Sequence, residues 1–137
     1  MKLEELNQQY QEAIDFISAQ LPMFSTTGVK AYNPGLERTL ELLDYINNPH
    51  LKTKFIHIAG TNGKGSTSHI LAATFQQAGY KTGLYTSPHL IDLRERIRIN
   101  GQCISKEFVI EFLALIKPCI AKIQPSYFEL NVAMAFY

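Results

Sequence analysis

The residues with the clearest chemical potential form a glycine-rich loop, Gly60-Thr61-Asn62-Gly63-Lys64-Gly65-Ser66. Small residues at the start of a helix let backbone N–H groups approach an anion, and the helix N-terminus adds partial positive charge. Lys64 would supply a point charge for the β- and γ-phosphates of a nucleotide, and Ser66 a hydroxyl for nucleotide-bound magnesium. The loop therefore predicts a phosphate-binding site.

This loop is a variant of the Walker A pattern, which requires glycine at position 58 and serine or threonine at position 65. The chain has Ile58 and Gly65 at these positions, so its pattern is G-x-x-G-K-x-S. The alternative is a tight strand-to-helix turn that uses glycine for backbone geometry alone. Three glycines and one lysine within seven residues favour phosphate binding.

The neighbouring segments would position the loop. Residues 54–59 are a short apolar run that predicts a buried strand, and residues 66–80 predict a helix that Gly79 ends. Residues 81–86 predict a second strand. A strand–loop–helix–strand unit of this length implies two parallel strands in one sheet, joined by a right-handed crossover. The predicted fold class is α/β, a P-loop NTPase-like parallel sheet with flanking helices.

Other elements flank this unit. Apolar spacing predicts a helix over residues 3–21, and Asn33 and Pro34 are suited to the cap and first turn of a second helix that ends before Pro49. The remaining signals are an Asn100-Gly101 hairpin turn, a helix that Ser105 caps and that Pro118 kinks or ends, and a capping box formed by Ser126 and Glu129.

The end of the chain indicates an incomplete domain. The sequence stops at Tyr137 inside an apolar, helical run with no C-terminal cap. Only two parallel strands precede it, whereas an α/β sheet normally has more strands and both faces covered. We therefore expect residues 1–137 to be the N-terminal part of a larger domain.

Composition narrows the class of protein. The chain has 13 Lys and Arg against 12 Asp and Glu, so its net charge is +1, and a nucleic-acid binder that works by bulk charge would be more basic. Two cysteines without CxxC spacing predict free thiols rather than a zinc site. The N-terminus lacks the pattern of a signal peptide, and no apolar run is long enough for a membrane span. We expect a cytoplasmic protein with no membrane or nucleic-acid partner.

Several segments together resemble one family. HIAGTNGKGSTSHIL at 57–71 resembles the phosphate loop of the folylpolyglutamate synthase and dihydrofolate synthase family, within the Mur ligase superfamily. YTSPHL at 85–90, ERIRINGQCIS at 95–105 and SYFELNVAMAF at 126–136 resemble the family's following segments. GLER at 35–38 also fits, so the resemblance spans residues 31–137 in the family's order.

The resemblance implies an activity. Enzymes of this family join L-glutamate to a folate or dihydropteroate carboxylate with hydrolysis of ATP. The carboxylate attacks the γ-phosphate to give an acyl phosphate, and the glutamate amine then displaces phosphate. Such chemistry requires charge neutralisation on the transferring phosphoryl group, by lysine and Mg²⁺. Residues 1–137 would be the N-terminal part of the ATP-binding domain. The rest of that domain and the C-terminal domain would lie beyond the chain, which would be inactive alone. The full-length enzyme would be a monomer.

The resemblance also implies roles for individual residues. Lys64 matches the catalytic lysine of the phosphate loop, Ser87 a serine that helps to hold magnesium, and Glu129 a glutamate ligand of the metal. The loop Ala31, Tyr32, Asn33 and Pro34 corresponds to a segment that contacts the pteroate in bacterial relatives.

Each of these roles has a simpler alternative. Ser87 could only end a strand before Pro88, Glu129 could only complete the capping box, and Tyr32 could anchor its loop instead of stacking on a pterin. The charges of the hairpin 95–105 are typical of a solvated face. His57 and His69 are expected to be packing residues, and His89 is given no catalytic role.

Two other functions remain compatible with the sequence. One is another amide ligase of the Mur superfamily, and the other is a nucleotide-binding module without catalytic activity. The sequence does not choose between dihydropteroate and tetrahydrofolate as the acceptor.

Overall fold

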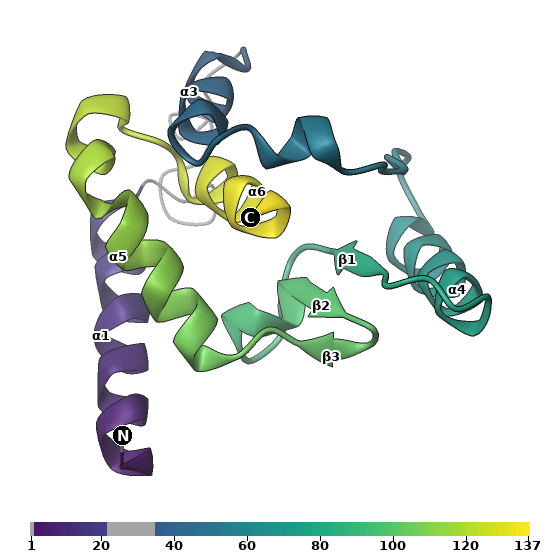
Figure 1. The fold of residues 1–137 in the computed structure, drawn as a ribbon, viewed down its shortest axis with the longest axis horizontal. Helices are drawn as coiled ribbons and strands as arrows, with labels where there is room; N and C mark the ends of the chain where they lie inside the picture. The colour runs from purple at the N-terminus through teal and green to yellow at the C-terminus, as the bar shows by residue number, and fades with distance from the viewer. Residues whose placement is uncertain (1, 22–34) are drawn as a thin grey trace. The chain divides into compact units, whose positions relative to one another are not determined.

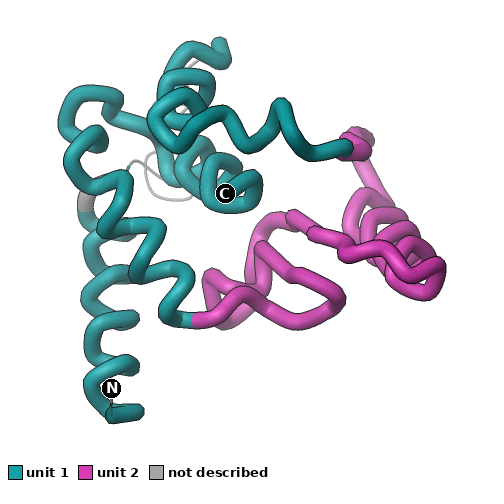
Figure 2. Tube along the Cα trace, in the orientation of Figure 1, with its two compact units in different colours: residues 1–54, 106–137 teal, residues 55–105 magenta. Residues whose placement is uncertain are grey.

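A computed structural model describes residues 2–21 and 35–137. By their contacts they divide into two compact units, which Figure 2 colours separately. Unit 1 lies within residues 1–54 and 106–137, and unit 2 comprises residues 55–105. Of the expected features, the cap at Asn33 and Pro34 lies outside the described residues.

The described part of unit 1 is helical. Its elements are α1 (Leu3–Gln20), α3 (Glu37–Tyr45), the short 3-10 helix η2 (Pro49–Lys52), α5 (Lys106–Ile123) and α6 (Tyr127–Phe136). Helix α1 lies along α5, and α3 packs against both α5 and α6 (Figure 1). Lys106 at the start of α5 donates to Asn7 Oδ1 of α1 at 2.7 Å, which joins the two longest helices by a polar bond as well as by packing.

Amphipathic spacing creates the core of unit 1. Helix α5 shows this clearly, because Val109, Phe112 and Ile116 are fully buried at helical spacing while Leu115 is 40% exposed. These residues meet apolar side chains of the other helices. The large side chains among those that are fully buried include Ile17, Leu42, Leu130 and Met134. The predicted helix over residues 3–21 is confirmed, and Leu21 is its C-cap.

Proline does not end α5. The helix passes through Pro118 and continues to Ile123, so of the two predicted effects of Pro118, a kink or an end, the end is wrong. A proline ring removes one N–H donor, but burial of Cys119, Ile120 and Ile123 in the following turn holds that turn in place. Tertiary packing outweighs the lost hydrogen bond here.

Unit 2 contains one long helix and a small sheet. Its elements are α4 (Lys64–Gln77), β1 (Gly83–Tyr85), the 3-10 helix η3 (Leu93–Arg96), β2 (Ile97–Ile99) and β3 (Gln102–Cys103). Strand β2 is central and pairs antiparallel with both neighbours. Gly79, with φ +88°, ends α4 as predicted, because the Tyr80 N–H donates to Phe75 O at 3.0 Å across the glycine.

The predicted hairpin is confirmed. Asn100 and Gly101 join β2 to β3 with φ of 50° and 78°, the pair of positive values that a tight two-residue hairpin requires. Asn100 also accepts the Thr82 N–H on its side chain at 2.9 Å, and this bond ties the turn to the residue before β1.

The predicted parallel pairing is absent from the described structure. Residues 54–59 form no strand, and Phe55 and Ile56 are 65% and 61% exposed. Strand β1 instead pairs antiparallel with β2. The connection between them is shorter than the predicted crossover, so closing it costs less conformational entropy. A buried parallel strand needs neighbours on both edges and cover on both faces, and residues 54–59 have neither among the described residues. The α/β class holds, but the sheet is small and antiparallel.

Unit 2 has little apolar burial. Only Ala72 of α4 is buried, while Ile70 of the same helix is 67% exposed. The buried apolar residues of the sheet region are Leu93, Ile97 and Ile104. Hydrogen bonds therefore carry much of the local order in unit 2.

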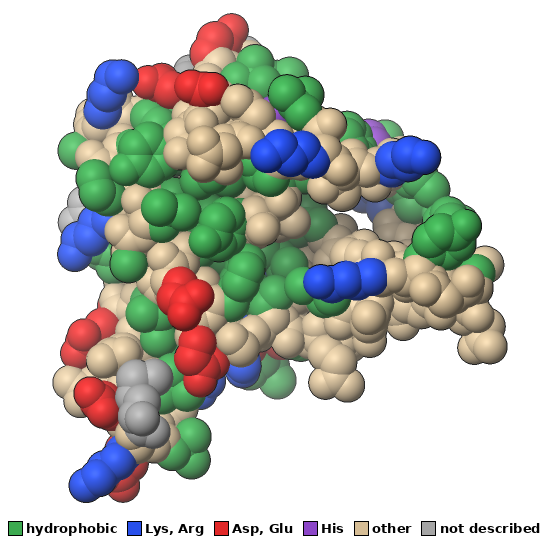
Figure 3. Space-filling model, in the orientation of Figure 1, with side chains coloured by type: hydrophobic (Ala, Val, Ile, Leu, Met, Phe, Trp, Pro, Cys, Tyr) green, Lys and Arg blue, Asp and Glu red, His purple; other side chains and the backbone are tan. Residues whose placement is uncertain are grey.

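Charge is spread over the surface. On the face shown in Figure 3, both acidic and basic side chains reach the surface. In the described stretches, none of the helices combines the length and apolar character required to cross a bilayer.

The α5 core gives a matched test of packing. Leu113 is 5% exposed and Leu115, two residues later, is 40% exposed. Leu113→Ala should lower the free energy of unfolding by about 2–5 kcal/mol, because it leaves a cavity in the core. Leu115→Ala should cost less than about 1 kcal/mol. Denaturant unfolding of both variants checks this, and equal losses would show that the described helix orientation is wrong.

Candidate functional site: a phosphate loop at the start of helix α4

The glycine-rich loop stands where a helix begins. Gly63 is the N-cap of α4 with φ +77°, and the first helical bond runs from the Thr67 N–H to Gly63 O at 2.9 Å. The N–H groups of residues 64–66 therefore precede the first intrahelical bond and lack an acceptor within the helix. The loop and the first turn of α4 are exposed. This arrangement can receive an anion on backbone N–H groups that share the positive end of the helix dipole.

Lys64 carries the positive charge of this loop. Its ammonium donates to Gly60 O at 2.5 Å and to Thr61 O at 3.2 Å, so the side chain folds back over the loop that precedes it. An ammonium has three N–H donors, and these bonds use two of them. One donor and the positive charge of the ammonium remain available at the loop.

The neighbouring histidines are not packing residues. His57 and His69 are both exposed, so that prediction is wrong. His57 belongs to the segment that forms no strand, and the Nδ1 of His69 lies 2.8 Å from Gly65 O, one turn earlier on α4. Ser68 likewise donates to Lys64 O at 2.8 Å. These bonds are local to the helix surface.

Ser87 follows the end of β1 in the same unit as the loop. It is exposed, precedes a cis peptide bond to Pro88, and its hydroxyl makes no hydrogen bond with a described residue. Residue 86, just before Ser87, is tied to the residue before β2, because the Thr86 N–H donates to Arg96 O at 2.9 Å. Ser87 thus presents a solvent-accessible oxygen at the start of a fixed loop.

The loop after Ser87 contains an internal network. Arg96 is 8% exposed and its Nε donates to His89 Nδ1 at 2.8 Å. Burial, and then the positive charge of Arg96, lower the pKa of His89 below its usual 6.5, while Glu95 and Asp92 act in the opposite direction. Because Nδ1 accepts from Arg96, the neutral imidazole is the form that this network stabilises.

Glu129 forms the predicted capping box of α6. The Glu129 N–H donates to Ser126 Oγ at 3.2 Å, and the Ser126 N–H donates to Glu129 Oε2 at 2.7 Å. Glu129 is 9% exposed, and Oε1 makes no hydrogen bond with a described residue. The capping role is therefore present, and it uses one carboxylate oxygen only.

The structure brings some of the predicted site residues together. The loop 60–66 is a continuous site, and Ser87 belongs to the same unit, whereas Glu129 belongs to unit 1. Ala31, Tyr32, Asn33 and Pro34 lie outside the described residues. Within the ranges that the structure describes, no three His, Cys, Asp or Glu side chains gather into a metal-binding cluster.

The chain is similar to known proteins over most of its length. No protein-family profile matches the chain. The dihydrofolate synthase/folylpolyglutamate synthase of Bacillus subtilis (strain 168) is 38% identical over 133 residues, which are 93% of this chain and 29% of that protein. The crystal structure of folylpolyglutamate synthase from Thermotoga maritima matches with a TM-score of 0.82 and 38% identity, covering 95% of this chain and 30% of that one.

A nucleotide complex is also among the similar structures. Mycobacterium tuberculosis folylpolyglutamate synthase complexed with ADP has a TM-score of 0.81 and 31% identity, covering 96% of this chain and 29% of that one. The chain belongs to the folylpolyglutamate and dihydrofolate synthase family. It spans less than a third of the length of each of these three family members.

Sequence reasoning missed one organising residue of this family member. Glu95 accepts backbone N–H groups from Leu90, Ile91 and Asp92, and it completes a second capping box with Asp92 at η3. The spacing Asp-x-x-Glu at 92–95 is the signal that could have found it. This signal was overlooked because the charge of Glu95 was assigned, with the others of residues 95–105, to a solvated hairpin face.

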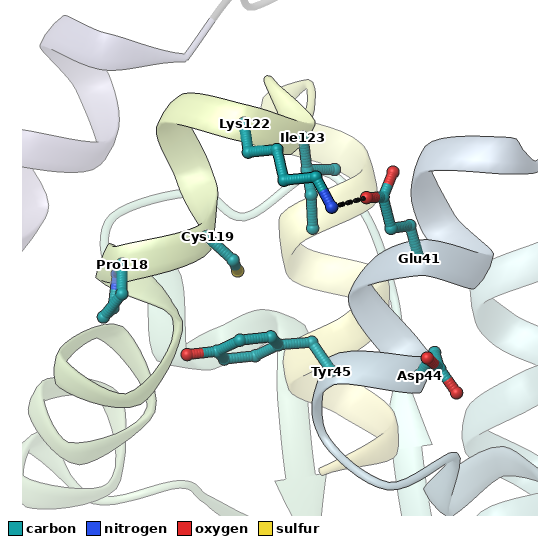
Figure 4. Close-up of a pocket in the computed structure, with 7 residues that line it drawn as sticks. All are labelled: Glu41, Asp44, Tyr45, Pro118, Cys119, Lys122 and Ile123. Atoms are coloured by element: carbon teal, nitrogen blue, oxygen red, sulfur yellow. Dashed lines mark ion pairs between the residues drawn. The ribbon is translucent and has the colours of Figure 1, made fainter.

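A groove in unit 1 offers no comparable chemistry. It measures about 310 Å³ and lies between α3 and α5 (Figure 4). Its lining residues are Glu41, Asp44, Tyr45, Pro118, Cys119, Lys122 and Ile123. Lys122 pairs with Glu41 at 3.2 Å, and Asp44 accepts from Asn48 at 2.8 Å. Burial raises the pKa of the Cys119 thiol, so it is not activated as a nucleophile.

The His89–Arg96 bond makes a pH prediction. In the wild type the titration midpoint of His89, followed by NMR, should lie below 6.5. Arg96→Gln removes the positive charge and should move the midpoint upward. Since the folded-state pKa of His89 is depressed, the neutral imidazole contributes stability that is present above pH 6.5 and is lost as the pH falls below 6.5 through the lower folded-state pKa. An unchanged midpoint in Arg96→Gln would show that the guanidinium does not act on this imidazole.

Proposed function

We propose that the protein containing this chain is an ATP-dependent ligase that joins L-glutamate to the carboxylate of a folate or a dihydropteroate. The observation that carries this proposal is the exposed loop 60–66 at the start of α4, with Lys64 folded over it, in a chain of this family. The loop provides a binding site for the phosphates of ATP. A cytoplasmic location is part of the same proposal, consistent with the two free thiols of Cys103 and Cys119.

The loop residues would act on the transferring phosphoryl group. The substrate carboxylate attacks the γ-phosphate, ADP leaves, and an acyl phosphate forms on the substrate; the glutamate amine then displaces phosphate to give the amide. Negative charge develops on the phosphoryl oxygens in the first step. Lys64 and the N–H groups of residues 64–66 would stabilise it, because they are fixed before the reaction and need little reorganisation.

Ser87 and Glu129 suit a hard divalent cation. The Ser87 hydroxyl has no described partner and is exposed, and Glu129 keeps Oε1 outside its capping bond. Oxygen donors of these kinds are what magnesium prefers, and magnesium usually retains several waters as well. We assign each residue, within its own unit, as a magnesium ligand. When bound, the ion would neutralise phosphate charge. Ala31, Tyr32, Asn33 and Pro34 remain our proposed contacts for the pteroate.

The role of Lys64 is tested by removing its charge. Lys64→Ala in the full-length protein should lower the ligase rate at least about a hundredfold, about 2.7 kcal/mol in the barrier, since the charge acts mostly on the transition state. Lys81→Ala is the matched control, because Lys81 is an exposed lysine of the same unit. A rate for Lys64→Ala within about threefold of the wild type, about 0.65 kcal/mol, would contradict the proposal.

The two roles of Glu129 are separated by a pair of variants. Glu129→Gln keeps the size of the side chain and can still serve in a capping box, but it removes the charge that magnesium prefers. It should raise the half-saturating magnesium at least about tenfold and barely move the metal-free melting temperature. Glu129→Ala should also lose the bond from the Ser126 N–H to the Glu129 side chain, while the Ser126 half of the box remains, at a cost of about 0.5–1 kcal/mol.

The measurement is a magnesium titration of ligase activity beside metal-free melting curves. Glu111→Gln, an exposed glutamate on α5, controls for the loss of one negative charge. If Glu129→Gln leaves the magnesium requirement unchanged, Glu129 is a structural cap and not a metal ligand.

A further inference from the structure

The loop from Ser87 to Arg96 is organised by one carboxylate. Glu95 Oε2 accepts the Leu90 N–H at 2.9 Å, and Oε1 accepts the N–H groups of Ile91 at 3.0 Å and Asp92 at 2.8 Å. Leu90 and Ile91 are 90% and 92% exposed, so their side chains contribute almost no packing within the described structure. The shape of residues 90–92 therefore depends on hydrogen bonds to Glu95 rather than on burial.

The ends of this loop are tied to the sheet. Thr86 at one end donates to Arg96 O at 2.9 Å, and Arg96 at the other end donates from Nε to His89. Between these ties the Glu95 side chain reaches back across the loop from η3. Ser87 lies between Thr86 and His89, so a loop held by Glu95 leaves Ser87 little freedom to move.

A carboxylate is the side chain that this arrangement requires. Its two oxygens can accept about four hydrogen bonds, and three are made here. Glutamine has the same size, but its NH₂ group is a donor, so it would place a donor against at least one of the three N–H groups. Replacement of Glu95 by Gln therefore breaks the arrangement by changing one atom and the charge.

We propose that Glu95 is a positioning residue, which holds residues 88–92 in one conformation and thereby presents the Ser87 hydroxyl to magnesium-bound nucleotide. This inference rests on the proposed function, in which Ser87 is a magnesium ligand. Glu95 does not touch the nucleotide; it acts through the backbone of the loop.

The hydrogen-bonding part of the inference is tested first, without any ligand. Amide hydrogen exchange of a peptide covering residues 88–94 is measured in the full-length wild type, in Glu95→Gln and in the charge control Glu111→Gln. Exchange at residues 90–92 should be slow in the wild type although their side chains are exposed, and at least about tenfold faster in Glu95→Gln only. Melting curves establish that each variant is folded. Equal exchange in all three proteins would overturn the proposal.

The link to Ser87 is tested by a double-mutant cycle. The magnesium concentration required for ATP binding is measured in the wild type, Ser87→Ala, Glu95→Gln and the double variant. Glu95→Gln should raise it several-fold when Ser87 is present and add nothing further in the Ser87→Ala background. Additive effects would show that Glu95 does not act through Ser87 and would overturn the positioning role.

The cycle also distinguishes this inference from the proposed function. If Ser87→Ala leaves the magnesium requirement unchanged, the metal assignment of Ser87 fails, and the positioning role fails with it. If Ser87→Ala raises the requirement while Glu95→Gln frees the loop without raising it, only the positioning role fails.

Discussion

Three consecutive N–H groups on one carboxylate are the interaction on which the loop between β1 and β2 depends. The Glu95 side chain fixes residues 90–92, and those residues lead into η3, from which Glu95 itself projects. The interaction joins residues three to five positions apart, so the entropic cost of closing this short loop is small. Because unit 2 has few buried apolar side chains, the hydrogen bonds to Glu95 hold the loop in place of a hydrophobic core.

The phosphate loop is likewise ordered by hydrogen bonds rather than by burial. Residues 60–66 are exposed and have no core beneath them in the described structure, and their order comes from the start of α4 and from Lys64. The ammonium of Lys64 satisfies two loop carbonyls and keeps its charge at the helix N-terminus. One side chain thus shapes the loop and supplies the electrostatic attraction for an anion. Unit 1 differs, because its helices enclose an apolar core, and polar contacts such as Lys106–Asn7 and Lys122–Glu41 join helices that already pack together.

Glu129 illustrates how a structural and a chemical role can share one side chain. Its Oε2 accepts the Ser126 N–H, which fixes the rotamer, and this leaves Oε1 as the oxygen outside the capping bond. A carboxylate that is already held by a helix cap loses little further entropy when it binds an ion. The capping box and the proposed ligand role therefore do not compete for the same oxygen, although the sequence pattern alone suggests that they conflict.

Local signals in the sequence determined much of this structure. The helix over residues 3–20, the Asn100-Gly101 hairpin, the helix end at Gly79 and the capping box at Ser126 each depend on residues within a few positions of one another, so their spacing alone predicts them. The phosphate loop was found in the same way, because its glycines and Lys64 are contiguous. Only the tertiary structure decided the pairing of the strands, the exposure of His57 and the passage of α5 through Pro118. Each of these depends on which distant segments cover a residue, and no local pattern encodes that. The bonds from the Leu90 and Ile91 N–H groups to Glu95 and the His89–Arg96 bond also required the folded loop, since groups close in sequence become partners only when the backbone turns them toward each other.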